Sequence, residues 1–124
     1  MGASLQQILT AIQLARQRIR WKPGKAERHL LKRIQLGQLP SGTTLGAYES
    51  LIRRILDDPI ADLYTFTYDQ ADYPTVVALI GDQHWLVMVD LNGQMETAFP
   101  VVRPETYFLD PRYTHWGRLQ EYLP

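Results

Sequence analysis

The sequence contains no cysteine, and this absence excludes several kinds of chemistry at once. Disulfide bonds, thiol nucleophiles and metal sites with cysteine ligands all need this residue. Long apolar runs are missing too. Gln6, Gln13 and Arg16 interrupt the N-terminal segment, and no stretch reaches the roughly 18 apolar residues of a membrane span. We therefore expect a cytoplasmic protein that makes no contact with a membrane.

A charge of one sign is also missing, because 13 basic residues balance 13 acidic ones. No global field therefore favours a nucleic acid or a membrane surface. The charges are nevertheless segregated. Between positions 16 and 33 Glu27 is the only acid among many Lys and Arg residues, whereas acids prevail from 57 to 105. The basic stretch predicts either a surface for an anionic partner or a solvated helix face.

Common catalytic signatures are absent as well. The histidines at positions 29, 84 and 115 lack the spacing of metal ligands, so we expect neither a metal nor another cofactor. The segment SGTTLG has no lysine and cannot form a P-loop. Serine is scarce and no nucleophile elbow appears, which argues against a serine hydrolase.

What remains has the size and composition of one domain over residues 1–124, with 45% hydrophobic residues. Apolar residues at helical spacing predict three helices in a helical part that ends near residue 58. They should cover about residues 5–21, 25–36 and 44–56. Ser4 and Gln7 form a capping box before the first helix, and Gly37 suits a left-handed cap after the second.

Beyond residue 62 the period of apolar residues changes to two, which predicts a sheet over residues 62–100. Its four strands should cover about residues 63–68, 75–80, 85–91 and 94–99. The fold class is then α+β, with three N-terminal helices packed on a four-stranded antiparallel β-meander. An irregular aromatic tail over 101–124 should wrap around the body, with a short helical turn near 117–122.

The dipeptide Asn92-Gly93 is the strongest hairpin signal, because a type I′ turn needs positive φ at both central residues. A two-residue turn at this point would place Met88 opposite Thr97. Met95 would then share the face of Thr97. Thr97 is either an ordinary strand residue, whose hydroxyl finds a local partner, or part of a site if its face turns toward the second helix.

The second helix separates apolar from polar residues. Its buried side should consist of Ala26, Leu30, Ile34 and, more loosely, Leu31. The opposite side should carry Lys25, His29, Lys32 and Arg33. Neighbouring cations disfavour the imidazolium form and would keep His29 neutral, hence able to accept a proton. The same cations would attract a phosphodiester and stabilise the charge of its transition state. RNA cleavage additionally needs only an acid for the leaving oxygen.

Three stretches carry a family resemblance: ERHLLKR and LGAYESLIRRILDDP on helices, and GDQHWLVMVDLNGQMETAFP in the sheet. Over residues 25–100 the chain resembles the barnase–EndoU–colicin D–RelE superfamily of RNases. Toxin domains of contact-dependent inhibition systems and related phage and cyanobacterial proteins show an HxxKH-type helix, a Tyr-containing helix and a strand reading like TAFP. The resemblance implies a metal-independent endoribonuclease toxin with RNA as substrate and an antitoxin or immunity protein as partner.

By motif position, His29 corresponds to the first histidine of this motif, Lys32 to its lysine and Thr97 to the hydroxyl residue of the last strand. Arg33 stands where the second histidine belongs, and arginine cannot act as a base because it stays protonated. The resemblance thus predicts His29 as the catalytic base, with Lys32, Arg33 and Thr97 as its catalytic partners. The predicted substrate-binding residues are Lys25, Arg28 and His84.

Two hypotheses follow from the presence of Arg33 in place of the second histidine of the motif. Either the domain cleaves RNA, with tRNA as one candidate, by attack of the 2′-hydroxyl. Or the same scaffold is a catalytically inactive module that binds RNA or a protein.

Overall fold

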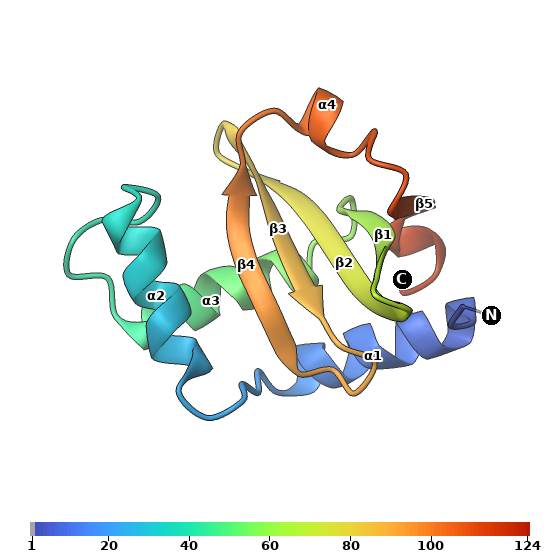
Figure 1. The fold of residues 1–124 in the computed structure, drawn as a ribbon, viewed down its shortest axis with the longest axis horizontal. Helices are drawn as coiled ribbons and strands as arrows, with labels where there is room; N and C mark the ends of the chain where they lie inside the picture. The colour runs from blue at the N-terminus through green and yellow to red at the C-terminus, as the bar shows by residue number, and fades with distance from the viewer. Residues whose placement is uncertain (1) are drawn as a thin grey trace.

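The computed structural model describes residues 2–124 (Figure 1). Three helices come first: α1 (Leu5–Gln17), α2 (Lys25–Gln35) and α3 (Leu45–Leu56). Four strands follow: β1 (Asp62–Tyr68), β2 (Ala71–Ile80), β3 (Gln83–Val89) and β4 (Met95–Val101). The last elements are the one-turn helix α4 (Pro104–Tyr107), the strand β5 (Tyr113–Arg118) and the 3₁₀ turn η1 (Leu119–Glu121). The predicted α+β class, with three helices before an antiparallel sheet, is confirmed.

The sheet has five strands in the order β4-β3-β2-β1-β5, so the prediction of four strands and an irregular tail is wrong. The tail residues Tyr113 to Arg118 pair with β1 and cover the edge that β1 would otherwise expose. Trp116 anchors this pairing, because its Nε1 donates to Thr65 Oγ1 at 2.8 Å. The helical turn expected near 117–122 is present as η1.

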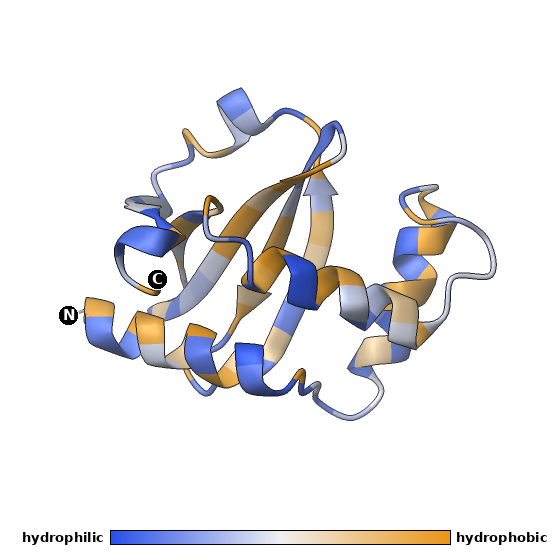
Figure 2. Ribbon diagram, turned by 180° about the vertical axis from the view of Figure 1, so that it is seen from behind, coloured by the Kyte–Doolittle hydropathy of each residue, from blue (hydrophilic) through white to orange (hydrophobic). Residues whose placement is uncertain are grey.

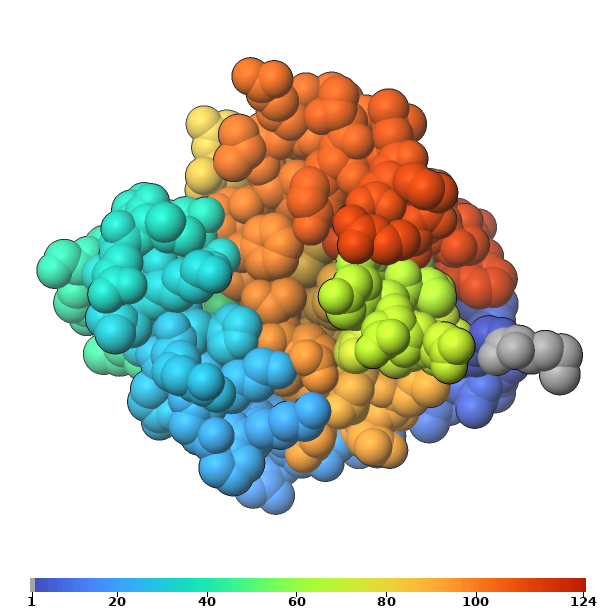
Figure 3. Space-filling view, in the orientation of Figure 1, coloured from blue at the N-terminus to red at the C-terminus, as the bar shows by residue number. Residues whose placement is uncertain are grey.

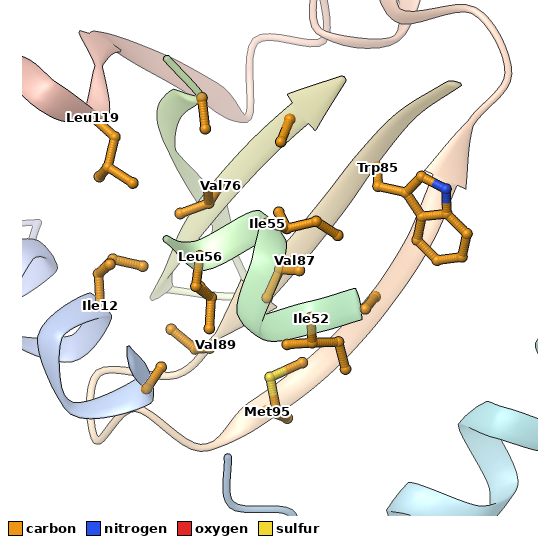
Figure 4. Packing of buried hydrophobic residues seen from close by; sticks show 14 of the residues in the cluster. Ile12, Ile52, Ile55, Leu56, Val76, Trp85, Val87, Val89, Met95 and Leu119 are labelled. Carbon is orange, nitrogen blue, oxygen red and sulfur yellow. The ribbon is translucent and has the colours of Figure 1, made fainter. Parts of the chain in front are cut away.

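Helices α1 and α3 cover one face of the sheet, and the core lies between these two helices and the sheet (Figure 2). Ile55 and Leu56 of α3 are fully buried between Ile12 of α1 and the strand residues Val87 and Val89 (Figure 4). Burying each such side chain contributes about 1.5–3 kcal/mol. Within residues 2–124 no helix is both long and apolar enough to cross a membrane.

Two helix ends agree with the sequence prediction and one does not. The capping box is present, with Gln7 N–H donating to Ser4 Oγ at 3.2 Å and Ser4 N–H to Gln7 Oε1 at 2.8 Å. Gly37 takes the left-handed conformation, with φ of 70°. Helix α1, however, ends at Gln17 and not near Trp21.

The chain after α1 leaves the helix because it pairs with the edge of β4. Met95 N–H donates to Arg20 O at 2.8 Å, and Trp21 forms a parallel bridge with Met95. These contacts require an extended backbone where the apolar spacing predicted helix. They also attach the segment before α2 to the first residue of β4.

The loop between β3 and β4 is not the predicted type I′ turn. Gly93 has positive φ (79°), but Asn92 does not, and Asp90 N–H donates to Gln94 O at 2.9 Å across a three-residue loop. The physical reason is the Asp90 carboxylate, whose Oδ1 accepts hydrogen bonds at 2.9 Å from the N–H groups of both Asn92 and Gln94. Such an Asx arrangement stabilises the longer loop.

A β-bulge follows the loop and restores the predicted register. Val89 pairs with Met95 and Met88 with Thr97, which leaves Glu96 as an extra residue on β4. The predicted pairing of Met88 with Thr97 is thus confirmed, although the loop was predicted wrongly. Met95 lies on the helix-covered face, fully buried, and not on the face of Thr97, because the bulge interrupts the alternation of side chains.

We expect Gly93→Ala to destabilise the fold by about 2–4 kcal/mol, because positive φ and overpacking both oppose a side chain here. A Cβ at Gly93 would lie 2.8 Å from Leu14 Cβ and 3.0 Å from Ala11 O of α1. Gly81→Ala is the matched control: φ is 63° but no atom lies within 4 Å of the added Cβ, so only about 1–2 kcal/mol should be lost. Urea denaturation measures both, and equal losses would contradict close packing of the loop on α1.

Candidate functional site

Helix α2 runs beside β4 in the same direction, and the two elements contact each other through matched pairs of residues (Figure 1). His29 Nδ1 lies 3.4 Å from Thr97 Oγ1. One helical turn later, the Arg33 guanidinium carbon lies 5.5 Å from the centroid of the Phe99 ring. The face of Thr97 therefore turns toward α2, which is the arrangement that a site at this position requires.

A cavity of about 660 Å³ opens along this contact, within the range of about 300–1,000 Å³ typical of ligand sites. Figure 3 shows β4 (orange) at the floor of a hollow between α2 (blue to cyan) and the segment that follows β4 (orange-red). His29, Lys32 and Arg33 line the cavity from one side, and Arg103 lines it from the other. No carboxylate of residues 2–124 lines it, so its charge is positive although the net charge of the chain is zero.

His29 is half-buried, with its ring held beside an indole. The ring centroids of His29 and Trp21 are 5.7 Å apart, and Trp21 Nε1 donates to Glu49 Oε2 of α3 at 2.9 Å. Burial is the main cause that lowers the pKa of His29 below 6.5. Four positive charges lower the pKa further: those of Lys25, Arg33, Arg28 and Lys32. The imidazole is therefore neutral at pH 7 and can accept a proton.

Arg33 is buried, with 5% of its surface exposed, so its predicted place on the solvated side of α2 is wrong. The reason is helical geometry: Arg33 follows buried Ala26 by seven residues, about two turns, and so lies on the same side. Leu31, expected to be loosely buried, points away and is 55% exposed. Arg33 Nε is buried without a hydrogen-bond partner among residues 2–124. Burial lowers the pKa of Arg33, an effect that Tyr48 opposes.

Tyr48 of α3 fixes the backbone of β4 between the two residues that face α2. Its hydroxyl donates to Ala98 O at 2.6 Å, and its side chain is fully buried. Burial raises the pKa of Tyr48 to about 12, while Arg33 lowers it, so the phenol keeps its proton and remains a donor. Tyr48 therefore positions Thr97 and Phe99 from behind the sheet.

The predicted substrate-binding residues lie in two separate places. Lys25 Nζ lies 2.8 Å from Glu96 Oε2 in an ion pair, so its charge is largely compensated. Lys25 and Arg28 line a smaller hollow of about 220 Å³ on the other side of His29. His84 does not line the main cavity; it lies on β3 opposite Val101.

Several residues that line the cavity were not predicted from the sequence: Gln38, Arg103, Thr106 and Tyr107. For Gln38 a signal was present, because a glycine at the left-handed cap folds the next residue back onto the last turn. For the other three there was none, since they belong to the tail that was expected to be irregular.

Comparison of the chain with models of protein families, with curated proteins and with solved structures finds no match. The resemblance to the barnase–EndoU–colicin D–RelE superfamily thus stays a prediction. Over the described part of the chain, no three His, Asp or Glu side chains are gathered so that they could hold a metal ion.

We expect Arg33→Met to stabilise the protein by about 1–2 kcal/mol in an anion-free buffer, because it removes a buried charge that forms no ion pair within residues 2–124 and keeps an apolar side chain beside Phe99. The wild type should gain thermal stability in inorganic phosphate through binding, whereas the variant should not. Arg53→Met on the exposed side of α3 is the control and should change stability by less than about 0.5 kcal/mol. A clear loss of stability in Arg33→Met would show that the guanidinium is structural.

The pKa of His29, read by NMR from its ring protons, should lie below 6.5. Arg28→Gln should raise this pKa, because it removes one positive charge and leaves burial unchanged. Since the pKa of His29 is lower in the folded than in the unfolded chain, His29 should reduce stability as the pH falls below about 6.5. A pKa at or above 6.5 in the wild type would contradict the electrostatics of the cavity.

Proposed function

We propose that this domain is a small metal-independent endoribonuclease that cleaves RNA in the cavity between α2 and β4. The proposal rests chiefly on one observation. A neutral imidazole and a buried guanidinium whose Nε has no hydrogen-bond partner line the same cavity, and no carboxylate of the described residues lines it. The imidazole supplies a base and the guanidinium a fixed positive charge for a phosphodiester. These are the groups that attack by a 2′-hydroxyl needs.

In the proposed reaction the 2′-hydroxyl proton passes to Nε2 of His29 as the 2′-oxygen attacks phosphorus. The phosphorane carries its negative charge against Arg33, which is already desolvated and in place. The P–O5′ bond then breaks, and the 5′-oxygen leaves with a proton from the Lys32 ammonium group, which lines the same cavity. The product is a 2′,3′-cyclic phosphate; His29 returns its proton to solvent and Lys32 takes one up.

Thr97 has a defined role in this proposal, because it selects the tautomer of His29. Nε2 can accept a proton only when the ring hydrogen is on Nδ1, and Nδ1 lies 3.4 Å from Thr97 Oγ1. Thr97 Oγ1 would accept the Nδ1 hydrogen and hold the ring in this form. Thr97 is therefore a positioning residue and does not contact the reacting atoms.

A second candidate function is an RNA-binding module without catalysis. It is favoured by the fact that only one histidine lines the cavity and that an arginine stands one residue after Lys32, where the motif has its second histidine. Such a module would use the same cations to hold phosphate groups. An active ribonuclease, by contrast, would act in the cytoplasm and would require an antitoxin or immunity protein in the cell that makes it.

We expect the purified protein to cleave single-stranded RNA in the presence of EDTA and to leave 2′,3′-cyclic phosphate ends. His29→Ala should lower the rate about 10²–10⁴-fold, the range for loss of a general base. Thr97→Val should lower the rate and Thr97→Ser should largely preserve it, because serine keeps the acceptor oxygen. His115→Ala, a histidine on β5 that pairs with Asp62 at 3.0 Å, is the matched control.

The same variants separate the two candidates in cells. Induced expression of the wild type should arrest growth and produce discrete new RNA ends, while His29→Ala should do neither. Healthy cells with intact RNA, together with salt-dependent RNA binding by the wild type, would identify the binding module instead. Full activity of His29→Ala would overturn the assignment of the base.

A further inference from the structure

Gln38 occupies an unusual position at the end of α2. Gly37 N–H donates to Ile34 O at 3.0 Å, and Gln38 N–H donates to Arg33 O at 2.9 Å. These two bonds form a Schellman motif, which folds residue 38 back beside residue 33. The two positions commonly hold apolar side chains that contact each other. Here they hold a glutamine and an arginine.

Each of these polar side chains has one buried atom that forms no hydrogen bond within residues 2–124. Arg33 Nε and Gln38 Oε1 are the buried side-chain atoms within residues 2–124 that form no hydrogen bond, and both residues line the main cavity. A buried polar atom without a partner costs roughly 1–3 kcal/mol, so two in one cavity indicate that a ligand satisfies them. Arg33 offers donors to an anion, whereas Gln38 Oε1 offers an acceptor to a donor.

Part of the cavity is lined by apolar side chains that are exposed to solvent. Val102 is 88% exposed, and Leu36 and Tyr107 are exposed as well, although all three line the same cavity. The Tyr107 ring packs edge-on against Phe99, with centroids 6.3 Å apart, and so forms an aromatic wall beside the Arg33 contact. A flat, partly apolar group bound here would cover this surface and could stack on the ring.

A ligand that suits the whole cavity therefore has an anionic end, a flat apolar body and a hydrogen-bond donor. An unpaired nucleotide has all three, and its donor is an exocyclic amino group of the base. Adenine, cytosine and guanine carry such a group; uracil carries none, and the only donor of its base is the ring N3–H. Hydrogen bonds that a site offers to one base discriminate against a base that cannot form them.

Building on the proposed function, we infer that the cavity binds a single unpaired nucleotide, with its phosphate at Arg33 and the exocyclic amino group of its base at Gln38 Oε1. Gln38 is then a specificity-determining residue that disfavours cleavage after uridine. The apolar wall of Tyr107 and Val102 holds the base, and the cationic end holds the phosphate.

The test compares cytidine 3′-monophosphate with uridine 3′-monophosphate, which differ at the base in two neighbouring groups: cytosine has a 4-amino group and an unprotonated N3, whereas uracil has a 4-oxygen and N3–H. In calorimetry the wild type should bind the cytidine compound roughly tenfold more tightly, the effect of one hydrogen bond to an otherwise unpartnered group. Gln38→Leu should remove this difference. Gln35→Leu, on the exposed side of α2, is the control and should preserve it.

Neither compound can be cleaved, so the result does not depend on catalysis. Equal affinities in the wild type, a difference that persists in Gln38→Leu, or no binding of either nucleotide would each overturn the inference. Inorganic phosphate tests the proposed function separately. Binding of phosphate to the wild type and not to Arg33→Met, without any preference among nucleotides, would overturn the role of Gln38 while leaving the anion site intact.

Discussion

The contact of α2 with β4 is the constraint on which the candidate site depends, and the buried side chain of Arg33 lies at its centre. A cation in this position must be sheltered by an aromatic ring or an anion, and Phe99 supplies the ring, with the guanidinium carbon 5.5 Å from its centroid. To bring Arg33 over Phe99, α2 must lie against the outer edge of the sheet and not on its helix-covered face. Helix α2 also contacts α3, and the cavity lies along its contact with β4 (Figure 1).

The geometry of helix and strand repeats this contact. Four residues of an α-helix rise about 6 Å, and two residues of a strand rise about 6.6 Å. When an α-helix lies beside a parallel strand, every fourth residue of the helix therefore lies next to every second residue of the strand. His29 contacts Thr97, and four residues later Arg33 contacts Phe99, two residues further along β4. The bulge at Glu96 determines which residues of β4 face α2. It turns Met95 into the core and leaves Thr97 and Phe99 on the side of α2.

Much of the fold and part of the site could be predicted from the sequence. The three helices and the pairing of Met88 with Thr97 follow from local patterns. The loop is one residue longer than predicted, and the pairing is as predicted only because the bulge adds one residue to β4. Strand β5 could not be foreseen, since its pairing depends on β1 and not on its own sequence. The seven-residue spacing of Arg33 from Ala26 already indicated that Arg33 is buried. It was nevertheless predicted to be solvated, because charged residues usually lie at the surface. Its contact with Phe99 needed the tertiary structure.

The neutral net charge does not weaken the case for an anion site, because the acidic residues are placed away from the cavity. Glu96 lies 2.8 Å from Lys25 and 3.6 Å from Lys22, so it compensates the cations at the start of α2. Lys32 and Arg33 lie about two helical turns after Lys25, and no carboxylate of the described residues lines the cavity beside them. The half of α2 beside Phe99 thus keeps its positive charge. An anion is attracted to this half by the placement of the charges, with no excess of basic residues in the chain as a whole.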